Sequence, residues 1–448
     1  MATEAVTPQA IVMADFKGKV DPDWCPGCGD FGVLAAVQKA LVELQIPKHQ
    51  VATISGIGCS SNFPGFIDTY GMHTLHGRSL PVATGMKMAN HAMTVLVTGG
   101  FGLVGSATVR RLAAIGRQVV ATDLDTPANR KAAAKLPNGV EARWADLTDP
   151  DQVEQLVSEV SPAAIIHLAA VIPPPIYRNA KLARRVNVEA TATLVRIAEA
   201  QPTPPRWVQA SSNAVFGSRN PHRSSEPVRA DMPMRASDLY SAHKIEAEEI
   251  VRASSLEWVV LRLGGVFSVD PSAMPLTTDA LYFESALPTD GRMHSVDVRD
   301  VAWAFAAATT ADVVGEILLI AGDNTHKIKY GDIGPALGAA RGLKGGLPTG
   351  RPGNPDNDDE WFVTDWMDAT RAQEALQFQH HSWDDMLAEM RANAGWTRYL
   401  LPPFAPLVRT ILKRRGAYWK APGRYADPWG AIRAKLGEPA PDKPYDRQ

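Results

Sequence analysis

The chain has 448 residues, and its 45% hydrophobic and 21% charged residues are typical of a globular protein rather than a disordered one. Its 46 Lys and Arg against 48 Asp and Glu give a net charge of −2, which lacks the basic excess expected of a nucleic-acid-binding protein. No apolar run approaches the roughly 18 residues that cross a bilayer, and the N-terminus does not look like a secretion signal. We therefore expect a cytoplasmic protein of two or three domains.

Cysteine occurs only in the first 60 residues, at Cys25, Cys28 and Cys59. An odd and sparse set excludes a disulfide scaffold, and the Cys-x-x-Cys spacing of the first two indicates metal or redox chemistry. Because the rest of the chain contains no Cys, we expect it to join two unrelated pieces.

From Thr94 onward, short apolar runs rich in β-branched residues alternate with stretches of helical periodicity. This alternation predicts an α/β fold, a doubly wound parallel sheet with helices on both faces. The predicted strands are 94–98, 118–122, 163–168, 206–211, 257–262 and 316–320, and the clearest helices are 104–115, 178–200, 238–253 and 298–307. Residues 343–360, rich in Gly, Pro, Asn and Asp, are expected to form a loop or a border between subregions.

The composition changes again after Trp396. Residues 400–412 are apolar but interrupted by three prolines, and a basic stretch with Tyr418 and Trp419 follows. Two interpretations stay open: a peripheral contact with a membrane surface or lipid substrate, or an arm that packs on the domain or at a dimer interface. The last residues, rich in Pro and charge, are expected to form a loose tail.

A glycine-rich turn, Thr98-Gly-Gly-Phe-Gly-Leu-Val-Gly105, follows the first predicted strand. Gly99, Gly102 and Gly105 would let the backbone turn tightly, approach a pyrophosphate and pack the next helix on the strand. The second strand ends at Asp123, whose carboxylate would bind ribose hydroxyls and repel a 2′-phosphate, which favours NAD over NADP. The alternative for Asp123 is a turn or helix-cap residue.

Tyr240 and Lys244 stand four residues apart at the start of a predicted helix, and therefore on one face of it. A fixed ammonium should lower the pKa of the phenol from its usual value near 10, so that Tyr240 could exchange a proton with a substrate hydroxyl. Ser212, where a strand runs into a turn, could hold the same substrate oxygen. Its alternative role is a turn hydroxyl.

From residue 93 to about residue 392, the chain resembles an extended short-chain dehydrogenase/reductase of the NAD-dependent epimerase/dehydratase family. The matching motifs are TGGFGLVG, Asp123, ADL at 145–147, HLAA at 167–170, SSNAVFG at 211–217, YSAHK at 240–244 and HSVDVRDV at 294–301. The resemblance implies a Rossmann domain with a small C-terminal substrate region, and NAD as the cofactor. By the same resemblance, NAD would be bound by the glycine turn with Phe101 and Leu103, by Asp146 and Leu147 at the adenine, and by Ala169 and Ala170 at the nicotinamide. Ser212, Tyr240 and Lys244 would form the catalytic triad, with Tyr240 and Lys244 also touching the cofactor.

Departures from the family pattern narrow the range of expected substrates and reactions. Asn213 and Ala214 stand where dehydratases carry Asp-Glu, which argues against water elimination. Gly265 stands where many members that handle nucleotide sugars carry Asn, and the apolar segment 171–177 favours a less polar substrate. We therefore predict oxidation or reduction of a secondary alcohol/ketone pair, with NAD-dependent epimerisation of a sugar as the alternative.

The first ninety residues carry other motifs: DWCPGCGD at 23–30, ISGIGCSS at 54–61, TYGMHTLHGR at 69–78 and LPVATGMK at 80–87. Together they resemble the start of the β subunit of 2-oxoacid:ferredoxin oxidoreductases, a family that uses thiamine diphosphate and an iron–sulfur cluster. Cys25, Cys28 and Cys59 match three of its cluster ligands, whereas a four-iron cluster takes four thiolates. We therefore expect neither cofactor in this truncated form. A ferredoxin-linked role of the segment is the alternative.

These observations predict a fusion with a crossover near residues 90–100. Residues 1–92 are the truncated β-subunit-like segment, 93–395 the NAD-binding domain, with its substrate region mainly at 265–295 and 320–395, and 396–448 the aromatic and basic C-terminal arm. The first segment should bury too little surface to fold firmly. A homodimer is a further expectation.

Overall fold

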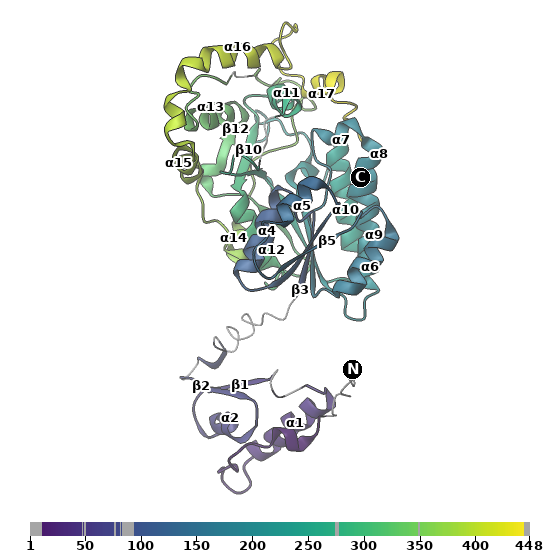
Figure 1. Cartoon of the computed structure of the whole chain (residues 1–448), viewed down its shortest axis with the longest axis vertical. Helices are drawn as coiled ribbons and strands as arrows, with labels where there is room; N and C mark the ends of the chain where they lie inside the picture. Colours follow the sequence, from purple (N-terminus) through teal and green to yellow (C-terminus); the bar gives the residue numbers. More distant parts are fainter. Residues whose placement is uncertain are drawn as a thin grey trace. The chain divides into compact units, whose positions relative to one another are not determined.

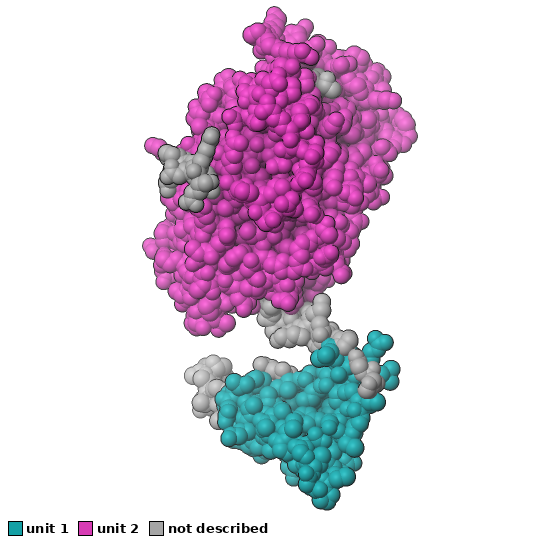
Figure 2. All heavy atoms as spheres, turned by 180° about the vertical axis from the view of Figure 1, so that it is seen from behind, with its two compact units in different colours: residues 1–91 teal, residues 92–448 magenta. Residues whose placement is uncertain are grey.

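The computed structural model of the chain divides into two compact units, Met1–His91 and Ala92–Gln448 (Figures 1 and 2). It describes residues 11–46, 48, 51–75, 78–80, 82, 94–273, 277–347 and 350–442. Residues 90–93 of the predicted crossover region therefore lie outside the described residues. Within these ranges, no helix has both the length and the apolar character that spanning a bilayer requires.

A seven-stranded parallel sheet forms the centre of the second unit, in the order β11-β8-β7-β6-β3-β4-β5 (Figure 1). Its strands are β3 (Thr94–Thr98), β4 (Gln118–Asp123), β5 (Val140–Trp144), β6 (Ala164–His167), β7 (Arg206–Ser212), β8 (Trp258–Leu263) and β11 (Ile317–Ile320). The predicted doubly wound Rossmann sheet is confirmed. Strand β5 was not predicted, because Glu141 and Arg143 interrupt its apolar pattern.

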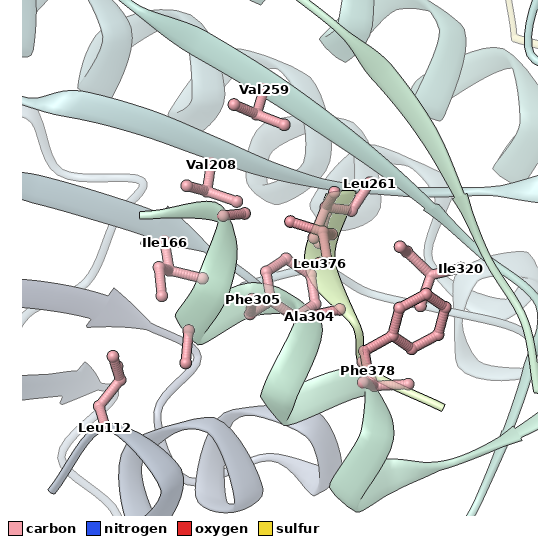
Figure 3. Close-up of a cluster of buried hydrophobic side chains, with 14 of the residues drawn as sticks. Leu112, Ile166, Val208, Val259, Leu261, Ala304, Phe305, Ile320, Leu376 and Phe378 are labelled. Atoms are coloured by element: carbon pink, nitrogen blue, oxygen red, sulfur yellow. The ribbon is translucent and has the colours of Figure 1, made fainter. Parts of the chain in front are cut away.

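Helices cover both faces of this sheet because successive residues of each strand point to opposite sides. Val95 and Val97 of β3 pack in one core cluster with Leu112 and Phe305, the last two drawn in Figure 3, whereas Leu96 belongs to a second cluster on the other face. The first cluster holds α4 (Leu103–Ala114) and α12 (Val298–Ala308), and the second α6 (Pro150–Val160), α9 (Ala190–Glu199) and α10 (Leu239–Ala253).

A smaller region follows β8 in the chain. It contains the three-stranded sheet β12-β10-β9, built from β9 (Gly265–Phe267), β10 (Arg292–Asp297) and β12 (Lys327–Lys329). Its helices are α11 (Thr278–Ala286), α13 (Tyr330–Ala340) and α15 (Trp383–Ala394). Three shorter helices of the unit are α5 (Pro127–Ala133), α7 (Pro175–Arg178) and α8 (Ala180–Arg184), and α14 (Thr370–Leu376) contacts β11 and α12.

The C-terminal region forms α16 (Ala405–Arg415) and α17 (Pro428–Lys435). Ile432 and Leu436 are buried in a cluster with Tyr177 of α7, and the carbonyl oxygen of Pro439 accepts a hydrogen bond from the N–H of Leu239 at 2.7 Å. The expectation of a loose tail is therefore wrong for residues 428–442, because their apolar side chains complete a core that begins far away in the sequence.

The first unit is a small body with α1 (Asp30–Glu43), α2 (Phe63–Phe66) and two parallel strands, β1 (Ala52–Ser55) and β2 (Tyr70–His73). Its buried apolar residues, among those described, are Phe16, Trp24, Leu34, Phe66 and Ile67. The ring of Trp24 packs edge-on against those of Phe31 and Phe66, with centroids 5.4 and 4.8 Å away.

Candidate active site

The glycine-rich turn joins β3 to α4 at the carboxyl edge of the parallel sheet. Gly99 has a φ of +65°, which side chains rarely tolerate. A Cβ on Gly105 would lie 2.0 Å from the carbonyl oxygen of Gly99, so helix and turn pack more closely than any other residue allows. The first N–H groups of α4, beginning with Leu103, have no partner within the helix and point toward this edge.

Asp123 ends β4 beside the turn. The N–H of Phe101 donates to its Oδ2 at 3.4 Å, and the N–H of Leu124 donates to its Oδ1 at 2.9 Å. The carboxylate therefore lies at the mouth of the glycine turn, close to where the adenosine ribose of a bound dinucleotide would sit.

The remaining predicted cofactor residues follow the ends of two further strands. Asp146 and Leu147 come after β5; the Oδ1 of Asp146 accepts two hydrogen bonds from the next turn, and Leu147 is buried. Ala169 and Ala170 come after β6, and the N–H of Ala169 donates to the hydroxyl of Thr98 at 3.4 Å.

These positions come from β3, β4, β5 and β6, which are neighbours in the sheet, and all lie at the same edge. An open crevice outside the carboxyl ends of such strands is where doubly wound folds bind dinucleotides. A Cβ built on Gly102 would meet only the Gly99 carbonyl oxygen, at 3.4 Å, so the turn presents bare and accessible backbone at this edge. The residues present therefore fit NAD.

Ser212, Tyr240 and Lys244 are brought together by the structure. Ser212 ends β7 and the other two lie on the first turns of α10, where the Ser212 hydroxyl is close enough to the Tyr240 phenol to lower its pKa. The Lys244 Nζ lies 5.8 Å from the centroid of the Tyr240 ring and donates to the carbonyl oxygen of Ala210 at 3.0 Å. The Ser212 hydroxyl also accepts from the N–H of Ala214 at 3.2 Å, so it serves the turn as well.

The prediction that Lys244 lowers the pKa of Tyr240 is wrong for this structure. Burial raises the pKa of the phenol well above its usual value, the hydrogen bond with Ser212 lowers it by less, and the nearby Asp238 raises it further. Lys244 is not among the groups that shift this pKa, and loss of water around the phenolate dominates because burial disfavours the charged form. The raised pKa favours the protonated phenol of Tyr240 at neutral pH.

Burial lowers the pKa of Lys244 to about 8, and the nearby Glu248 acts in the opposite direction. Glu248 forms a fully buried ion pair with Arg262, whose Nε and Nη2 donate to its two oxygens at 3.0 and 2.7 Å. The Ser211 hydroxyl also donates to Glu248, at 2.5 Å. Sequence reasoning missed this network, although a charged residue in the apolar run 257–262 and a glutamate four residues after Lys244 were visible signals.

The start of α10 is fixed by a buried cap. The Asp238 carboxylate accepts from the N–H of Ser241 at 2.9 Å and from the Tyr177 hydroxyl at 2.7 Å. Burial raises the pKa of Asp238 despite these hydrogen bonds. This cap holds the helix turn that carries Tyr240.

Aromatic and apolar side chains surround Tyr240 on the side of the smaller region. Its cluster includes Tyr330, Phe362 and Trp429, and the Phe362 ring lies 6.3 Å from that of Tyr330 and 5.6 Å from that of Trp429, centroid to centroid. At Gly265, an added Cβ would meet the Met293 sulfur at 2.6 Å. A side chain at position 265 would therefore require Met293 to move.

A cleft of about 860 Å³ lies along α4, between α5, α12 and the loop after β9. It begins at Phe101–Leu103 and is lined by the cations Arg110, Lys131 and Lys135. Neither Ser212 nor Tyr240 borders it, so the cleft adjoins the glycine turn on the helix side and does not cover the triad.

The three cysteines of the first unit are all free thiols; Cys25 and Cys59 are exposed and Cys28 is partly buried. The Cys28 sulfur lies 3.4 Å from the Asp30 carboxylate. In the part of the chain that the structure describes, no three His, Cys, Asp or Glu side chains gather as a metal site. The cluster ligands implied by the resemblance stay a prediction.

Comparison with known families identifies the second unit. The family model described as the NAD dependent epimerase/dehydratase family matches residues 95–321, half of the chain. The chain belongs to this family. The predicted resemblance is thereby confirmed, and the NAD predicted from the glycine turn agrees with the cofactor in the family's name.

Solved structures share the fold of this NAD-dependent epimerase/dehydratase unit. UDP-glucose 4-epimerase from Thermotoga maritima superposes with a TM-score of 0.55 and 19% identity, covering 69% of this chain and all of that one. The Thermus thermophilus UDP-glucose 4-epimerase, solved with NAD, superposes with a TM-score of 0.55 and 23% identity, and the match covers 68% of this chain and all of that one. A dTDP-glucose 4,6-dehydratase from Bacillus anthracis, also solved with NAD, superposes with a TM-score of 0.55 and 17% identity. The match covers 68% of this chain and 98% of the dehydratase. At these identities the likeness shows the fold alone.

The N-terminal region is similar to different proteins, as predicted. Subunit beta of 2-oxoacid:ferredoxin oxidoreductase 1 from Aeropyrum pernix is 49% identical over 106 residues, 24% of this chain and 33% of the relative. The subunit beta from a Sulfolobus species is 47% identical over 100 residues, 22% and 33% respectively. The chain thus spans about a third of the length of these curated relatives.

Proposed function

We propose that the second unit binds NAD across the ends of β3–β6 and interconverts a secondary alcohol and a ketone. NAD, when bound, supplies the acceptor or donor of the hydride. The observation that carries the proposal is that Ser212, Tyr240 and Lys244 lie close together at the carboxyl edge of the sheet, the edge at which the glycine turn also lies.

In the direction of reduction, the protonated phenol of Tyr240 donates its proton to the substrate carbonyl oxygen as that oxygen becomes a hydroxyl. Ser212 holds the same oxygen through its hydroxyl. The Lys244 ammonium stabilises the phenolate that remains, because opposite charges a few ångströms apart favour the charged form. In the direction of oxidation, each step runs in reverse.

The surroundings of Tyr240 favour an apolar substrate. Tyr240 packs against a cluster with several aromatic side chains, and a side chain at position 265 would meet Met293. Apolar walls with a few placed polar groups are typical of sites for small organic ligands.

Epimerisation is the second candidate, because solved structures with the same fold include two UDP-glucose 4-epimerases. An epimerase would oxidise and re-reduce the same carbon and release no NADH. The two functions therefore differ in their net products.

The test is turnover of Tyr240→Phe on a panel of secondary alcohols, sterols and UDP-sugars. We expect the rate of NADH formation to fall by about 10²–10⁴-fold while NAD affinity, measured by fluorescence, stays unchanged. Tyr425→Phe, which removes a hydroxyl outside this cluster, is the matched control and should keep full activity. Retained turnover in Tyr240→Phe would reject the mechanism, and conversion of a UDP-sugar without NADH would establish the epimerase instead.

A ferredoxin-linked role of the first unit is tested by iron analysis of the purified full chain. A brown protein with bound iron would support electron transfer through Cys25, Cys28 and Cys59. A colourless, iron-free protein that still forms NADH would assign the activity to the second unit alone.

A further inference from the structure

Residues 396–424, which we call the basic arm, expose an unusual amount of apolar surface. Eleven large hydrophobic side chains of the second unit are exposed among the residues described, and seven of them lie in this arm. They are Trp396, Tyr399, Leu400, Phe404, Leu407, Ile411 and Trp419. An apolar patch of this kind on an otherwise polar surface marks an interaction site.

The apolar side chains form a stripe along α16. Leu407 and Ile411 are four residues apart and Phe404 precedes them by three, so all three lie on one side of the helix. Ala405 is buried, and Val408 and Leu412 are partly buried on the adjoining side, where α16 meets α11. The helix therefore covers the unit with one edge of its apolar face and leaves the other edge in solvent.

The arm is also strongly cationic. It holds seven Lys and Arg and no Asp or Glu, whereas the rest of the chain has 39 basic and 48 acidic residues. Lys413, Arg414 and Arg415 are exposed in the last turn of α16, directly after the apolar stripe. No ion pair links any of the seven cations to an acidic residue in the described ranges; six of them are exposed, and Arg398 is partly buried and donates to the Tyr399 hydroxyl.

We propose that the basic arm docks the enzyme on an anionic phospholipid surface, with the α16 stripe inserted among the acyl chains and the cations at the headgroups. A short helix with one apolar face, cations beside it and Trp or Tyr at its ends has the chemistry of an interfacial anchor. Anionic lipid complements both properties of the arm at once, because it offers a hydrocarbon interior beneath a layer of negative charge.

A second copy of the chain fits this surface less well. A two-fold dimer brings the same patch of both subunits together, so the seven cations of one arm would face the seven of the other. No acidic residue of the arm is present to relieve that repulsion. The same charges that oppose such a dimer favour the lipid.

The arm is fastened to the second unit at its C-terminal end, so docking would hold the whole unit at the membrane. The Tyr418 hydroxyl donates to the carbonyl oxygen of Ala286 at 2.7 Å. The Arg351 guanidinium donates to the carbonyl oxygens of Ala421 and Pro422 at 2.6 and 2.9 Å.

The test is co-sedimentation of the full chain with vesicles of phosphatidylcholine alone and of phosphatidylcholine mixed with phosphatidylglycerol. We expect binding to the mixed vesicles only, and release by about 1 M salt, which shortens the screening length to about 3 Å. Replacing Lys413, Arg414 and Arg415 by Gln should weaken the partition constant roughly 100-fold, since each cation near the surface contributes about five-fold. The double variant Leu407→Ser/Ile411→Ser should weaken it by about ten-fold or more.

Matched controls separate the arm from the general surface. The triple variant Lys181→Gln/Arg196→Gln/Arg252→Gln removes three exposed cations from α8, α9 and α10, and Leu182→Ser/Val314→Ser removes two exposed apolar side chains elsewhere. Both should bind vesicles like the parent chain. Equal binding by parent and arm variants, or no binding to mixed vesicles, would overturn the proposal. So would a stable dimer in solution that Leu407→Ser/Ile411→Ser dissociates, because the stripe would then belong to a second copy.

Discussion

The two units of the chain differ in how far they bury their apolar side chains. Among the residues described, the first unit buries five hydrophobic side chains and exposes eleven large ones, while residues 94–395 of the second expose only four. The second unit carries the matched family region, whereas the first corresponds to about a third of its relatives' length. A small unit buries a smaller fraction of its surface than a large one, which accords with the more exposed apolar side chains of the first unit.

The basic arm gives a third case. Its seven exposed hydrophobics are more numerous for its length than those of the described part of the first unit, and all its charged residues are cations. The first unit mixes acidic residues such as Asp15, Asp30 and Asp68 with its basic ones. The exposed apolar side chains of the first unit thus lie among charges of both signs, whereas those of the arm lie among cations alone.

The largest effect should come from the core of the second unit. Phe305 is fully buried between α12 and the sheet, so Phe305→Ala should lower the free energy of unfolding by about 3–5 kcal/mol. Phe66→Ala in the first unit should leave that transition unchanged. Urea titration of both variants measures this, and an equal loss in both would mean that the units unfold as one.

Lys244 should couple the stability of the second unit to pH. Burial lowers its pKa from 10.5 to about 8, so between these values the unfolded chain binds more protons than the folded one. The free energy of unfolding should therefore rise with pH across this window, by up to about 3 kcal/mol from this residue. In Lys244→Met the rise should be smaller by that amount in urea titrations at several pH values. An identical pH slope in the variant would contradict a buried, charge-destabilised lysine.

Gly105→Ala should damage the cofactor site of the second unit. The added Cβ would stand 2.0 Å from the Gly99 carbonyl oxygen, so the turn must open and NAD affinity should fall about 10- to 100-fold. Gly56→Ala in the first unit is the matched control, since its Cβ meets nothing within 4 Å. Titration with NAD, followed by fluorescence, measures the affinity of both variants. Unchanged affinity in Gly105→Ala would mean that the dinucleotide does not bind at this turn.

The smallest effect should follow deletion of residues 1–91. The core clusters of the second unit consist of its own residues, so its free energy of unfolding should change by less than about 0.5 kcal/mol. NAD affinity should also persist. A marked loss of either in the shortened chain would show that the first unit supports the second.

Sequence patterns predicted the elements that carry the glycine turn and the triad. The strand 94–98, the helix after it and the helix that begins near Tyr240 agree with the structure within one or two residues. These elements depend on local spacing, which a single sequence displays. Strand β5 and the β9, β10 and β12 sheet were missed because their strands are short or polar and gain their stability from neighbours.

Spacing along the chain determined which residues meet at the glycine turn and on α10, since glycines three residues apart share one turn and a Tyr–Lys pair four apart shares one helix face. Only the tertiary structure decided the protonation of Tyr240, the buried partners Glu248 and Arg262, and the docking of residues 428–442. Each of these depends on the exclusion of water by segments distant in the sequence. The burial of a residue depends on all of these contacts together, and a local sequence pattern therefore cannot predict it.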